Sequence, residues 1–229
     1  MNAKAIEHDA ATEALIREVD EDLKRDKAEK LWKAYGAYVV AAAAILVLGV
    51  AGNEGWSHWK TSQAQSDSAR FAQVSQQATQ GKAEDSLSGL EAMAKDGGAV
   101  YATLAEMKKA GILTIRGETA KAVESYRLAA THSGMGPLYQ SAAKLNALAL
   151  QIDSGDSAAL EAELAPLAGA SEPWRHSAQE LQALLAIRMG DYAKAQDIYT
   201  RLSDDATAPH GLRARAAELR QSLEAKGRS

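Results

Sequence analysis

A run of twenty residues without a charged side chain, residues 34–53, interrupts a chain that is otherwise rich in charge. As an α-helix rising 1.5 Å per residue, it would span about 30 Å, the thickness of the hydrocarbon core of a bilayer. Its valine, isoleucine and leucine side chains each favour insertion by roughly 0.3–0.6 kcal/mol. Aromatic residues, which prefer the headgroup region, gather towards both ends: Trp32, Tyr35, Tyr38, Trp56 and Trp59. We therefore predict a single transmembrane helix with these five residues as membrane-interface anchors.

A cleaved signal peptide and a buried helix of a soluble domain are the two alternatives for this run. A signal peptide needs a short basic segment before its apolar core, whereas here more than thirty residues with many acids precede the run. A helix in a soluble core rarely lacks charge over so long a stretch. The length and the flanks therefore favour a single-pass membrane anchor in contact with the lipid bilayer.

Lysine and arginine residues are concentrated before the apolar run. Six of them lie within residues 17–33, but only Lys60 and Arg70 lie in the first eighteen residues after Asn53. Positive residues close to a membrane span remain on the cytoplasmic side. The N-terminus is therefore predicted to be cytoplasmic, and the residues after Trp56 are predicted to lie across the membrane, which in a bacterium is the periplasm.

Small residues along the run could allow a second transmembrane helix to approach closely: Ala37, Ala41, Ala44 and Ala51. They leave a homo-oligomer possible, although an alanine-rich span without a specific contact is the favoured explanation.

The composition excludes several kinds of chemistry. A formal charge of −4 argues against a nucleic-acid-binding protein, which needs a concentrated basic surface. Without cysteine there is no disulfide, thiolate nucleophile or cysteine-bound zinc. The five histidines are isolated from one another, fit no metal-ligand spacing and are predicted to lie at the surface. We identify no catalytic, cofactor-binding or metal-binding residue, expect no cofactor, and disfavour an enzyme, which would need a convergent polar cluster.

A glycine turn recurs along the second part of the chain at Gly81, Gly117, Gly155 and Gly190, with separations of 36, 38 and 35 residues. This period is typical of stacked helical hairpins. A large apolar residue follows each glycine by nine positions, and an aromatic residue precedes the last three by sixteen: Leu90, Tyr126, Leu164 and Tyr199; Tyr101, Tyr139 and Trp174. Each unit is therefore predicted to be a helix, a glycine turn and a second helix.

Other residues support the same hairpins. Ala122 and Ala195 are small enough for the second helix to pack closely on the first, and Pro137 and Pro173 are predicted to start first helices. Residues 209–226 place an apolar stripe opposite a charged face, which suits a terminal cap. The predicted fold is all-α: one N-terminal transmembrane helix, then an α-solenoid of helical hairpins with a C-terminal capping helix.

The predicted organisation has four parts. Residues 1–33 form a charged, helical, cytoplasmic segment, and residues 34–53 form the transmembrane helix. Residues 54–80 form a helical linker next to the membrane, and residues 81–226 form the repeat domain.

Polar residues recur on the predicted first helices of the hairpins. If these helices line a concave surface, the polar residues would face a bound protein: Glu106, Lys109, Gln140, Lys144, Arg175, Gln179 and Gln182. Their mixture of charges and amides suits many protein partners better than it suits one acidic or basic motif.

The spacing resembles the tetratricopeptide repeat, which has its turn glycine, a small residue five positions later and a large residue at nine. That repeat also has bulky apolar residues eleven and eight positions before the glycine, where this chain has polar residues such as Glu106 and Lys109.

The stretch IREVDEDLKRDKAEKLWKAYG, residues 16–36, together with the anchor and the repeats, resembles the ancillary subunit family of the bacterial SecYEG translocon, in its alphaproteobacterial branch. The resemblance implies an inner-membrane protein with a periplasmic repeat domain. It further implies a scaffold beside the Sec translocon that passes secreted client proteins to periplasmic chaperones. An envelope scaffold that coordinates cell division or cell-wall synthesis is the alternative.

Overall fold

In the computed structural model, the backbone is described for residues 3–226, and the side chains are described for residues 25, 27, 29–42 and 44–225. Within this part the chain consists of α-helices and one short 3₁₀-helix, without a strand, which confirms the predicted all-α class. Most side chains of the expected charged segment, residues 1–33, lie outside the described residues. The chain divides after Ser62 into two units, and each unit is described by itself.

The first unit consists of most of helix α1 (Ala3–Thr79). Alanine and leucine have high helix propensity, and α1 contains no proline to interrupt it. Its large apolar residues, from Val39 to Val50, are between 55% and 72% exposed. This stretch of helix therefore has no apolar packing partner within the described chain.

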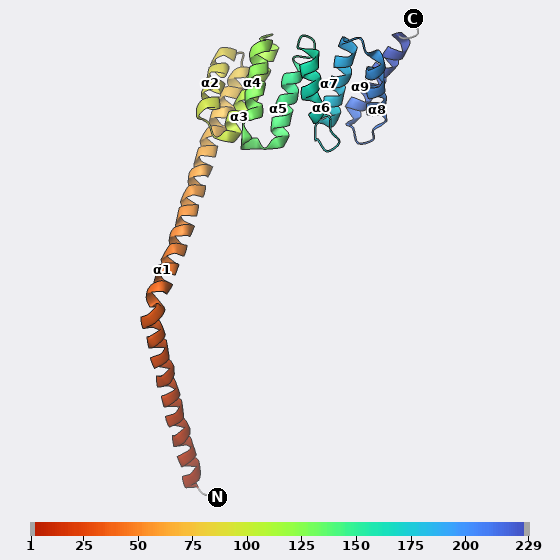
Figure 1. Ribbon diagram of the computed structural model, residues 1–229. Helices are drawn as coiled ribbons and strands as arrows, with labels where there is room; N and C mark the ends of the chain where they lie inside the picture. The colour runs from red at the N-terminus through yellow and green to blue at the C-terminus, as the bar shows by residue number, and fades with distance from the viewer. Residues whose placement is uncertain (1–2, 227–229) are drawn as a thin grey trace. The chain divides into compact units, whose positions relative to one another are not determined.

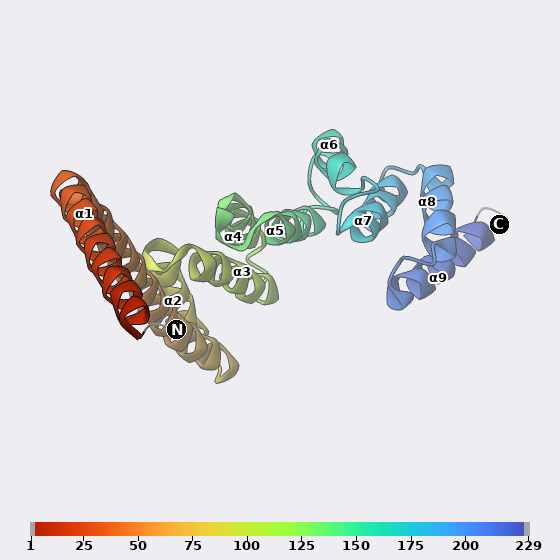
Figure 2. The same cartoon turned by 90° about the horizontal axis from the view of Figure 1, so that it is seen from below.

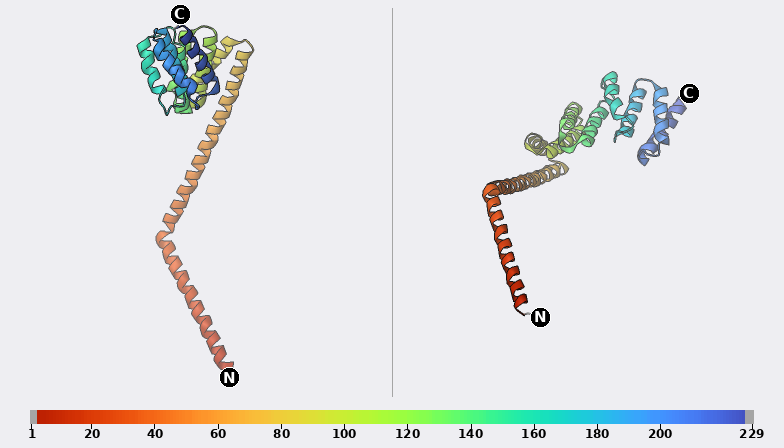
Figure 3. Two further views of the ribbon diagram at one scale, coloured as in Figure 1. Left: turned by 90° about the vertical axis from the view of Figure 1, so that its right-hand side faces the viewer. Right: turned by 60° about the horizontal axis from the view of Figure 1, so that its bottom comes forward.

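The second unit is a file of helices that stack one after another, as Figures 1 and 3 show. Seen from below in Figure 2, α4, α6 and α8 lie on one side of the file, and α3, α7 and α9 lie on the other. After the end of α1, the unit contains α2 (Ala83–Asp96), α3 (Ala99–Ile115), α4 (Thr119–Thr131), η1 (Ser133–Met135), α5 (Pro137–Ala149), α6 (Ser157–Leu167), α7 (Arg175–Arg188), α8 (Tyr192–Asp204) and α9 (His210–Lys226).

Three of the four predicted glycine turns share one backbone geometry. Gly81, Gly117 and Gly190 have φ values of +79°, +74° and +80°, in the left-handed region that side chains disfavour. In each turn the glycine N–H donates to the carbonyl three residues earlier, and the next N–H donates to the carbonyl five residues earlier. These paired bonds satisfy carbonyl groups that the end of a helix leaves free. The recurring glycines therefore mark helix ends for a definite physical reason.

The first hairpin pairs the last turns of α1 with α2. Phe71 and Val74 of α1 pack with Leu90 and Met93 of α2, and the two helices cross closely at Gly89. A Cβ atom on that glycine would lie 2.1 Å from Val74, so a larger residue does not fit there. The expected linker, residues 54–80, thus contributes apolar side chains to the core, although its polar composition did not suggest it.

The third hairpin differs from the others. Gly155 is not among the glycines with positive φ, and its turn extends from Leu150 to Asp156. Five positions after Gly155 stands Leu160, where the second and fourth hairpins have Ala122 and Ala195. The larger side chain is 3% exposed and packs in one buried cluster with Leu145 and Leu148 of α5.

Arg188 of α7 holds this unusual turn in place. Its guanidinium donates to the carbonyl oxygens of Ile152 and Gly155 and to the hydroxyl of Ser157. A side chain of the next hairpin thus donates hydrogen bonds to carbonyl groups of this turn. In the turns with a left-handed glycine, backbone N–H groups donate to such carbonyls.

Helix α9 closes the end of the file, as predicted. Leu212 and Ala216 are 5% and 1% exposed, and Leu219 and Leu223 pack partly against the same cluster. That cluster also contains Tyr199 of α8, whose side chain is fully buried. The predicted cap is therefore confirmed in its apolar stripe.

Of the two prolines predicted to start helices, one does so and the other does not. Pro137 is the first residue of α5, as expected. Pro173 is not in a helix: it belongs to the turn before α7, which begins at Arg175 with Trp174 as its N-cap. The prediction for Pro173 was therefore wrong, because the turn extends one residue beyond the proline before the helix begins.

The aromatic residues that precede the turn glycines are not equivalent. Tyr101 is partly buried and packs 6.2 Å from the ring of Phe71, measured between centroids. The indole N–H of Trp174 donates to the carbonyl of Leu138 at 2.9 Å. Tyr139 is 42% exposed in the first turn of α5, so it is not a core residue.

Candidate functional site

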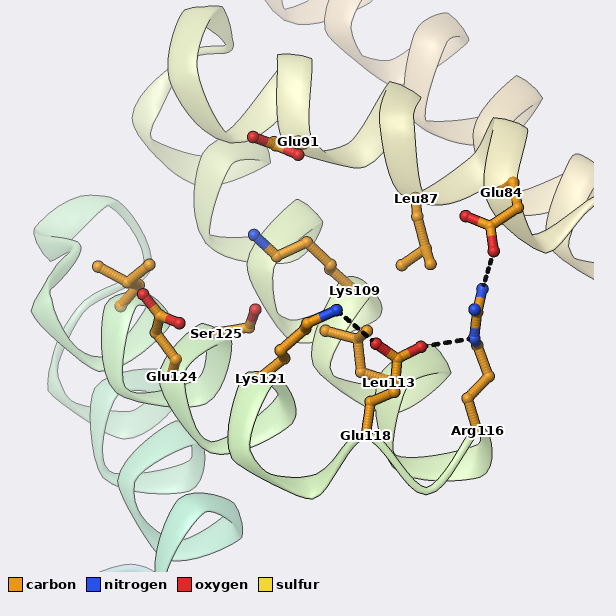
Figure 4. Close-up of a pocket in the computed structure, with 11 residues that line it drawn as sticks. Glu84, Leu87, Glu91, Lys109, Leu113, Arg116, Glu118, Lys121, Glu124 and Ser125 are labelled. Carbon is orange, nitrogen blue, oxygen red and sulfur yellow. Dashed lines mark hydrogen bonds and ion pairs between the residues drawn. The ribbon is translucent and has the colours of Figure 1, made fainter.

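A groove with charged walls lies between α2, α3 and α4, as Figure 4 shows; we call it the charged groove. Its volume is about 550 Å³. Four carboxylates and three cations line it together with three leucines and a serine: Glu84, Glu91, Glu118 and Glu124; Lys109, Arg116 and Lys121; Leu87, Leu113 and Leu128; Ser125. Charges of both signs therefore face this groove.

Four of these residues form a chain of ion pairs along one rim (Figure 4). The Nη1 atom of Arg116 lies 2.6 Å from Oε1 of Glu84, and its Nε atom lies 2.8 Å from Oε1 of Glu118. The Nζ atom of Lys121 lies 2.7 Å from the other oxygen of Glu118, and this hydrogen bond lowers the pKa of Glu118. The rim thus joins α2 to the turn between α3 and α4, and its charges largely satisfy one another.

Helix α3 carries an ion pair between the buried Glu106 and the partly buried Lys109, next to the charged groove. Glu106 is 4% exposed, and the Nζ atom of Lys109 lies 2.9 Å from one of its carboxylate oxygens. A buried carboxylate needs such a partner, because an unpaired charge away from water is unfavourable. Of the two, Lys109 lines the groove, whereas Glu106 is buried beneath the surface.

The other polar residues of the predicted row bond to neighbouring segments of the chain. Lys144 Nζ lies 3.7 Å from Glu163, and Arg175 donates to the Thr207 hydroxyl at 2.9 Å. The three glutamines donate at 3.1–3.5 Å to acceptors on other segments: Gln140 to the His132 carbonyl, Gln179 to the Ala168 carbonyl and Gln182 to Glu161. None of these five lines the charged groove. The structure therefore spreads the row over several contacts between segments.

A second groove lies between α5 and α7; we call it the apolar groove. It consists of two adjoining hollows of about 480 and 280 Å³ that share Ala149 and Leu181. Residues from α5 and the turn after it form one wall, and residues of α7 with its N-cap form the other: Ala142, Leu145, Asn146, Ala149, Ile152 and Asp153; Trp174, Ser177, Glu180, Leu181, Leu184, Ile187 and Arg188. The hollow next to Leu184 has mainly apolar walls, whereas the hollow next to Ser177 and Glu180 has polar and apolar walls in nearly equal measure.

Helix α7 carries apolar residues on two faces. Ala178 and Leu185 are fully buried in the core, whereas Leu181 and Leu184 are only partly buried and line the apolar groove. The sequence patterns did not predict this groove. The signal that could have revealed it is the second apolar stripe of α7, since a helix needs one stripe to pack on its own hairpin.

His176 lies in the interior, contrary to the prediction that all five histidines are at the surface. It is 7% exposed, and its Nε2 atom lies 2.9 Å from Oδ2 of Asp205 in the loop between α8 and α9. The position was misjudged because Asp205, 29 residues later, supplies the polar partner that makes burial possible. His8 lies outside the residues with described side chains.

No group of three or more histidine, aspartate or glutamate residues suited to hold a metal ion is present among the described residues.

The predicted membrane-interface residues of α1 are all exposed: Trp32, Tyr35, Tyr38, Trp56 and Trp59, at 55–73%. The rings of Trp56 and Trp59 are tilted by 35° with 5.2 Å between their centroids, and the Lys60 amine lies 5.4 Å from the centroid of the Trp56 ring. The described chain contains one helix region long and apolar enough to span a bilayer, Glu29–Thr79, and 6% of its most apolar window is buried.

The stacked hairpins and the surface grooves define a helical-repeat protein, a class whose repeats together form extended surfaces for other proteins. The chain belongs to the tetratricopeptide repeat-like domain family, whose model matches residues 29–223. Comparison with curated proteins and with solved structures gave no match. Domains of this family typically act as non-catalytic protein-binding scaffolds.

Proposed function

We propose that this protein is a membrane-anchored scaffold that binds other proteins with its repeat domain. The observation that carries the proposal is the exposed apolar surface of α1 in a chain that also contains a folded repeat domain. From Val39 to Val50 the large apolar side chains are 55–72% exposed. Leaving a large apolar side chain in water instead of burying it costs roughly 1.5–3 kcal/mol. A bilayer removes this cost over the whole stretch at once.

The proposed membrane span is residues 34–53, with residues 1–33 in the cytoplasm and the repeat domain in the periplasm. The excess of lysine and arginine before the span supports this orientation. Because Phe71 and Val74 pack on α2, the proposed linker is short and ends before these residues. The repeat domain then begins within the last part of α1.

The proposed location within the envelope is beside the Sec translocon, where the scaffold would receive secreted proteins and pass them to periplasmic chaperones. The likeness of residues 16–36 to the ancillary translocon subunits supports this role, as does the family of the repeat domain. A charged and an apolar groove on one domain suit clients of varied sequence.

A topology reporter tests the membrane anchor. A phosphatase that is active only outside the cytoplasm, fused after Ser229, should be active in intact cells. The same fusion with residues 34–53 deleted is the control and should be inactive. Activity of both fusions, or of neither, would contradict the proposed crossing.

Photocrosslinking in living cells tests the role at the translocon. A photoreactive residue at Leu128 in the charged groove, or at Leu184 in the apolar groove, should capture translocon subunits, periplasmic chaperones or secreted chains. The same residue at Asp197 on α8, which lines neither groove, is the control. Capture of division or cell-wall enzymes instead would support the alternative of an envelope scaffold for those processes.

A further inference from the structure

We propose that the charged groove binds a basic segment of a partner protein, whose lysine or arginine side chains lie on the leucines of the groove with their cationic ends at Glu91 and Glu124. This inference rests on the proposed scaffold function and specifies the kind of segment that this surface of the scaffold holds.

The charged groove opens on the side of the repeat domain that the second helices form. Its walls are α2 and α4, the second helices of the first two hairpins, and α3 contributes Lys109 and Leu113 between them (Figure 4). Helix α4 lies on the opposite side of the file from α7 and α9, as Figure 2 shows. A segment bound in this groove would therefore leave the surface between the first helices free.

The three cations that line the groove already have carboxylate partners within the chain. Arg116 and Lys121 hold the two carboxylates of the ion-pair rim. Lys109 lies 2.9 Å from Glu106, which is 4% exposed and lies outside the groove lining. A buried carboxylate retains its cation, because separation would leave its charge unpaired away from water. The lining cations are therefore committed, and an anionic ligand would have to break existing pairs.

Two lining carboxylates remain after these pairs, one on each wall: Glu91 on α2 and Glu124 on α4 (Figure 4). Glu124 is exposed and has no ion pair in the described part of the chain. Glu91 pairs with Lys95 at 2.9 Å, one turn further along α2, and their side chains are 58% and 74% exposed. Exposed pairs at this spacing are weak, so Glu91 can accept a second cation. The groove thus offers two carboxylates to a cationic ligand.

The apolar part of the lining determines which cation fits best. Leu113 is buried, Leu87 is partly buried and Leu128 is 43% exposed. A hydrated inorganic cation gains nothing from these leucines. Lysine and arginine carry alkyl stems that cover apolar surface while their charged ends stay in water. Leucines beside carboxylates therefore favour these two side chains.

The walls set the length of the bound segment. On α4 the lining residues Lys121, Glu124 and Leu128 stand at positions i, i+3 and i+7, and on α2 the lining extends over residues 84–91. At 1.5 Å per residue each wall is about 10 Å long. An extended chain rises about 3.3 Å per residue and places alternate side chains on one side. About three residues of the partner therefore lie in the groove, with cations at the first and third.

A peptide-labelling experiment tests the inference with the full chain in nanodiscs of phosphatidylcholine, whose headgroups carry no net charge. The probe is a short peptide with lysine and leucine at alternate positions and a photoreactive residue at one end, used below saturation. Mass spectrometry should locate its adducts in residues 84–91 and 109–128. Raising the salt concentration from about 50 to about 500 mM should reduce the labelling. A matched peptide with glutamine in place of lysine should leave both stretches nearly unlabelled.

Two charge reversals provide the main comparison. Glu124→Lys should reduce labelling by at least about fivefold, because it removes an exposed ion pair and adds a repulsion of similar size. Asp197→Lys makes the same change in net charge on α8, outside the groove, and should leave labelling unchanged. Both side chains are exposed, so both variants should keep the fold, which circular dichroism verifies.

A shorter cation tests the role of the leucines. A peptide with 2,4-diaminobutyrate in place of lysine keeps the positive charges but lacks two methylene groups in each stem. It should label the groove about fourfold less, which is the effect of one buried methylene group.

Several outcomes would overturn the inference. Adducts mainly outside the two stretches, or wild-type labelling of Glu124→Lys, would show that the groove does not hold the basic segment. Equal reductions by Glu124→Lys and Asp197→Lys would show a general attraction to an acidic protein. Equal labelling by the diaminobutyrate peptide, or competition by magnesium as strong as by the unlabelled lysine peptide, would show that the groove accepts any cation.

The two proposals fail in different ways. If the peptide avoids the charged groove but the full chain still captures partner proteins in cells through Leu184, only the present inference fails. If neither Leu128 nor Leu184 captures a protein partner, the scaffold function itself fails.

Discussion

The Nε2 atom of His176, in the first turn of α7, lies 2.9 Å from the Oδ2 atom of Asp205, in the loop between α8 and α9. Thr207 donates two hydrogen bonds to the same carboxylate: its hydroxyl donates to Oδ1, and its backbone N–H donates to that oxygen at 2.8 Å. The hydrogen bonds from Thr207, with that from His176, hold the pKa of Asp205 well below its ordinary value of 3.8. One ionised carboxylate thus ties the last hairpin to the loop that leads into the cap.

This geometry predicts a specific dependence of stability on pH. A carboxyl group whose pKa is lowered by folding stabilises the folded state above its ordinary pKa and loses that contribution as the pH falls through the folded value. The Asp205→Asn variant should therefore unfold at a lower urea concentration than the wild type at about pH 7, and the difference should shrink at about pH 3. Urea unfolding followed by circular dichroism at both pH values measures this. A difference of the same size at both would show that the charge of Asp205 is not responsible.

Removal of the His176 side chain should lower the free energy of unfolding more than Asp205→Asn does, because His176 is buried. His176→Ala leaves the site without its buried hydrogen-bond donor or acceptor and should cost about 1–3 kcal/mol of unfolding free energy. The matched control is His132→Ala, since His132 is half-buried and uses only its backbone carbonyl in the hydrogen bond with Gln140. Equal losses from the two substitutions would place His176 at the surface after all.

Two tyrosines at recurring positions should behave differently when replaced by alanine. Tyr199 is fully buried, and burial raises its pKa to about 12. Tyr199→Ala should cost about 3–5 kcal/mol, as other large aromatic deletions in cores do. Tyr139→Ala should cost less than about 1 kcal/mol, because the ring is 42% exposed. Chemical denaturation measures both values; a cost for Tyr139 as large as that for Tyr199 would contradict the structure.

Two glycines should respond in opposite directions to the same substitution. Gly117 has a φ of +74°, so Gly117→Ala should destabilise the protein by about 1–2 kcal/mol. Gly111 lies inside α3 with no atom within 4 Å of an added Cβ, so Gly111→Ala should stabilise it by about 0.5–1 kcal/mol. Thermal or urea unfolding of the two variants gives the comparison. Two changes of the same sign would show that the turn does not need a left-handed residue.

The proposed anchor predicts that one charge at the centre of the apolar run weakens membrane insertion. Val47 is 67% exposed, and aspartate at the middle of a span costs roughly 2.5–3.5 kcal/mol. Val47→Asp should therefore move protein from the carbonate-resistant membrane fraction to the soluble fraction. Val100→Asp makes the same change at an exposed valine of the repeat domain and should remain in the membranes. Identical fractionation of the two variants would count against the anchor.

Local sequence patterns predicted the parts of the fold that depend on one segment at a time. Glycines that recur every 35–38 residues marked helix ends, since three of these turns need a residue with positive φ. The apolar stripe of residues 209–226 predicted that α9 would pack as a cap, and Leu212 and Ala216 do so. Such features are visible without tertiary structure because backbone geometry and helical periodicity act over a few residues.

Features that depend on two distant segments could not be predicted in this way. Gln182 of the expected partner-binding row, for example, donates to Glu161 of the preceding hairpin, a contact that the sequence did not predict. His176 is buried only because Asp205 lies beside it in space. Each contact depends on which helices become neighbours, and a single sequence does not contain that information.

By itself, the sequence determined an all-helical chain of stacked hairpins after one long apolar stretch, because helix propensity, periodicity and glycine turns are local properties. Only the tertiary structure decided which polar residues are satisfied internally and where the surface opens between α5 and α7. Close packing is the physical reason: a polar partner such as Asp205 beside His176, or a groove between two helices, exists only once the chain has brought distant segments together.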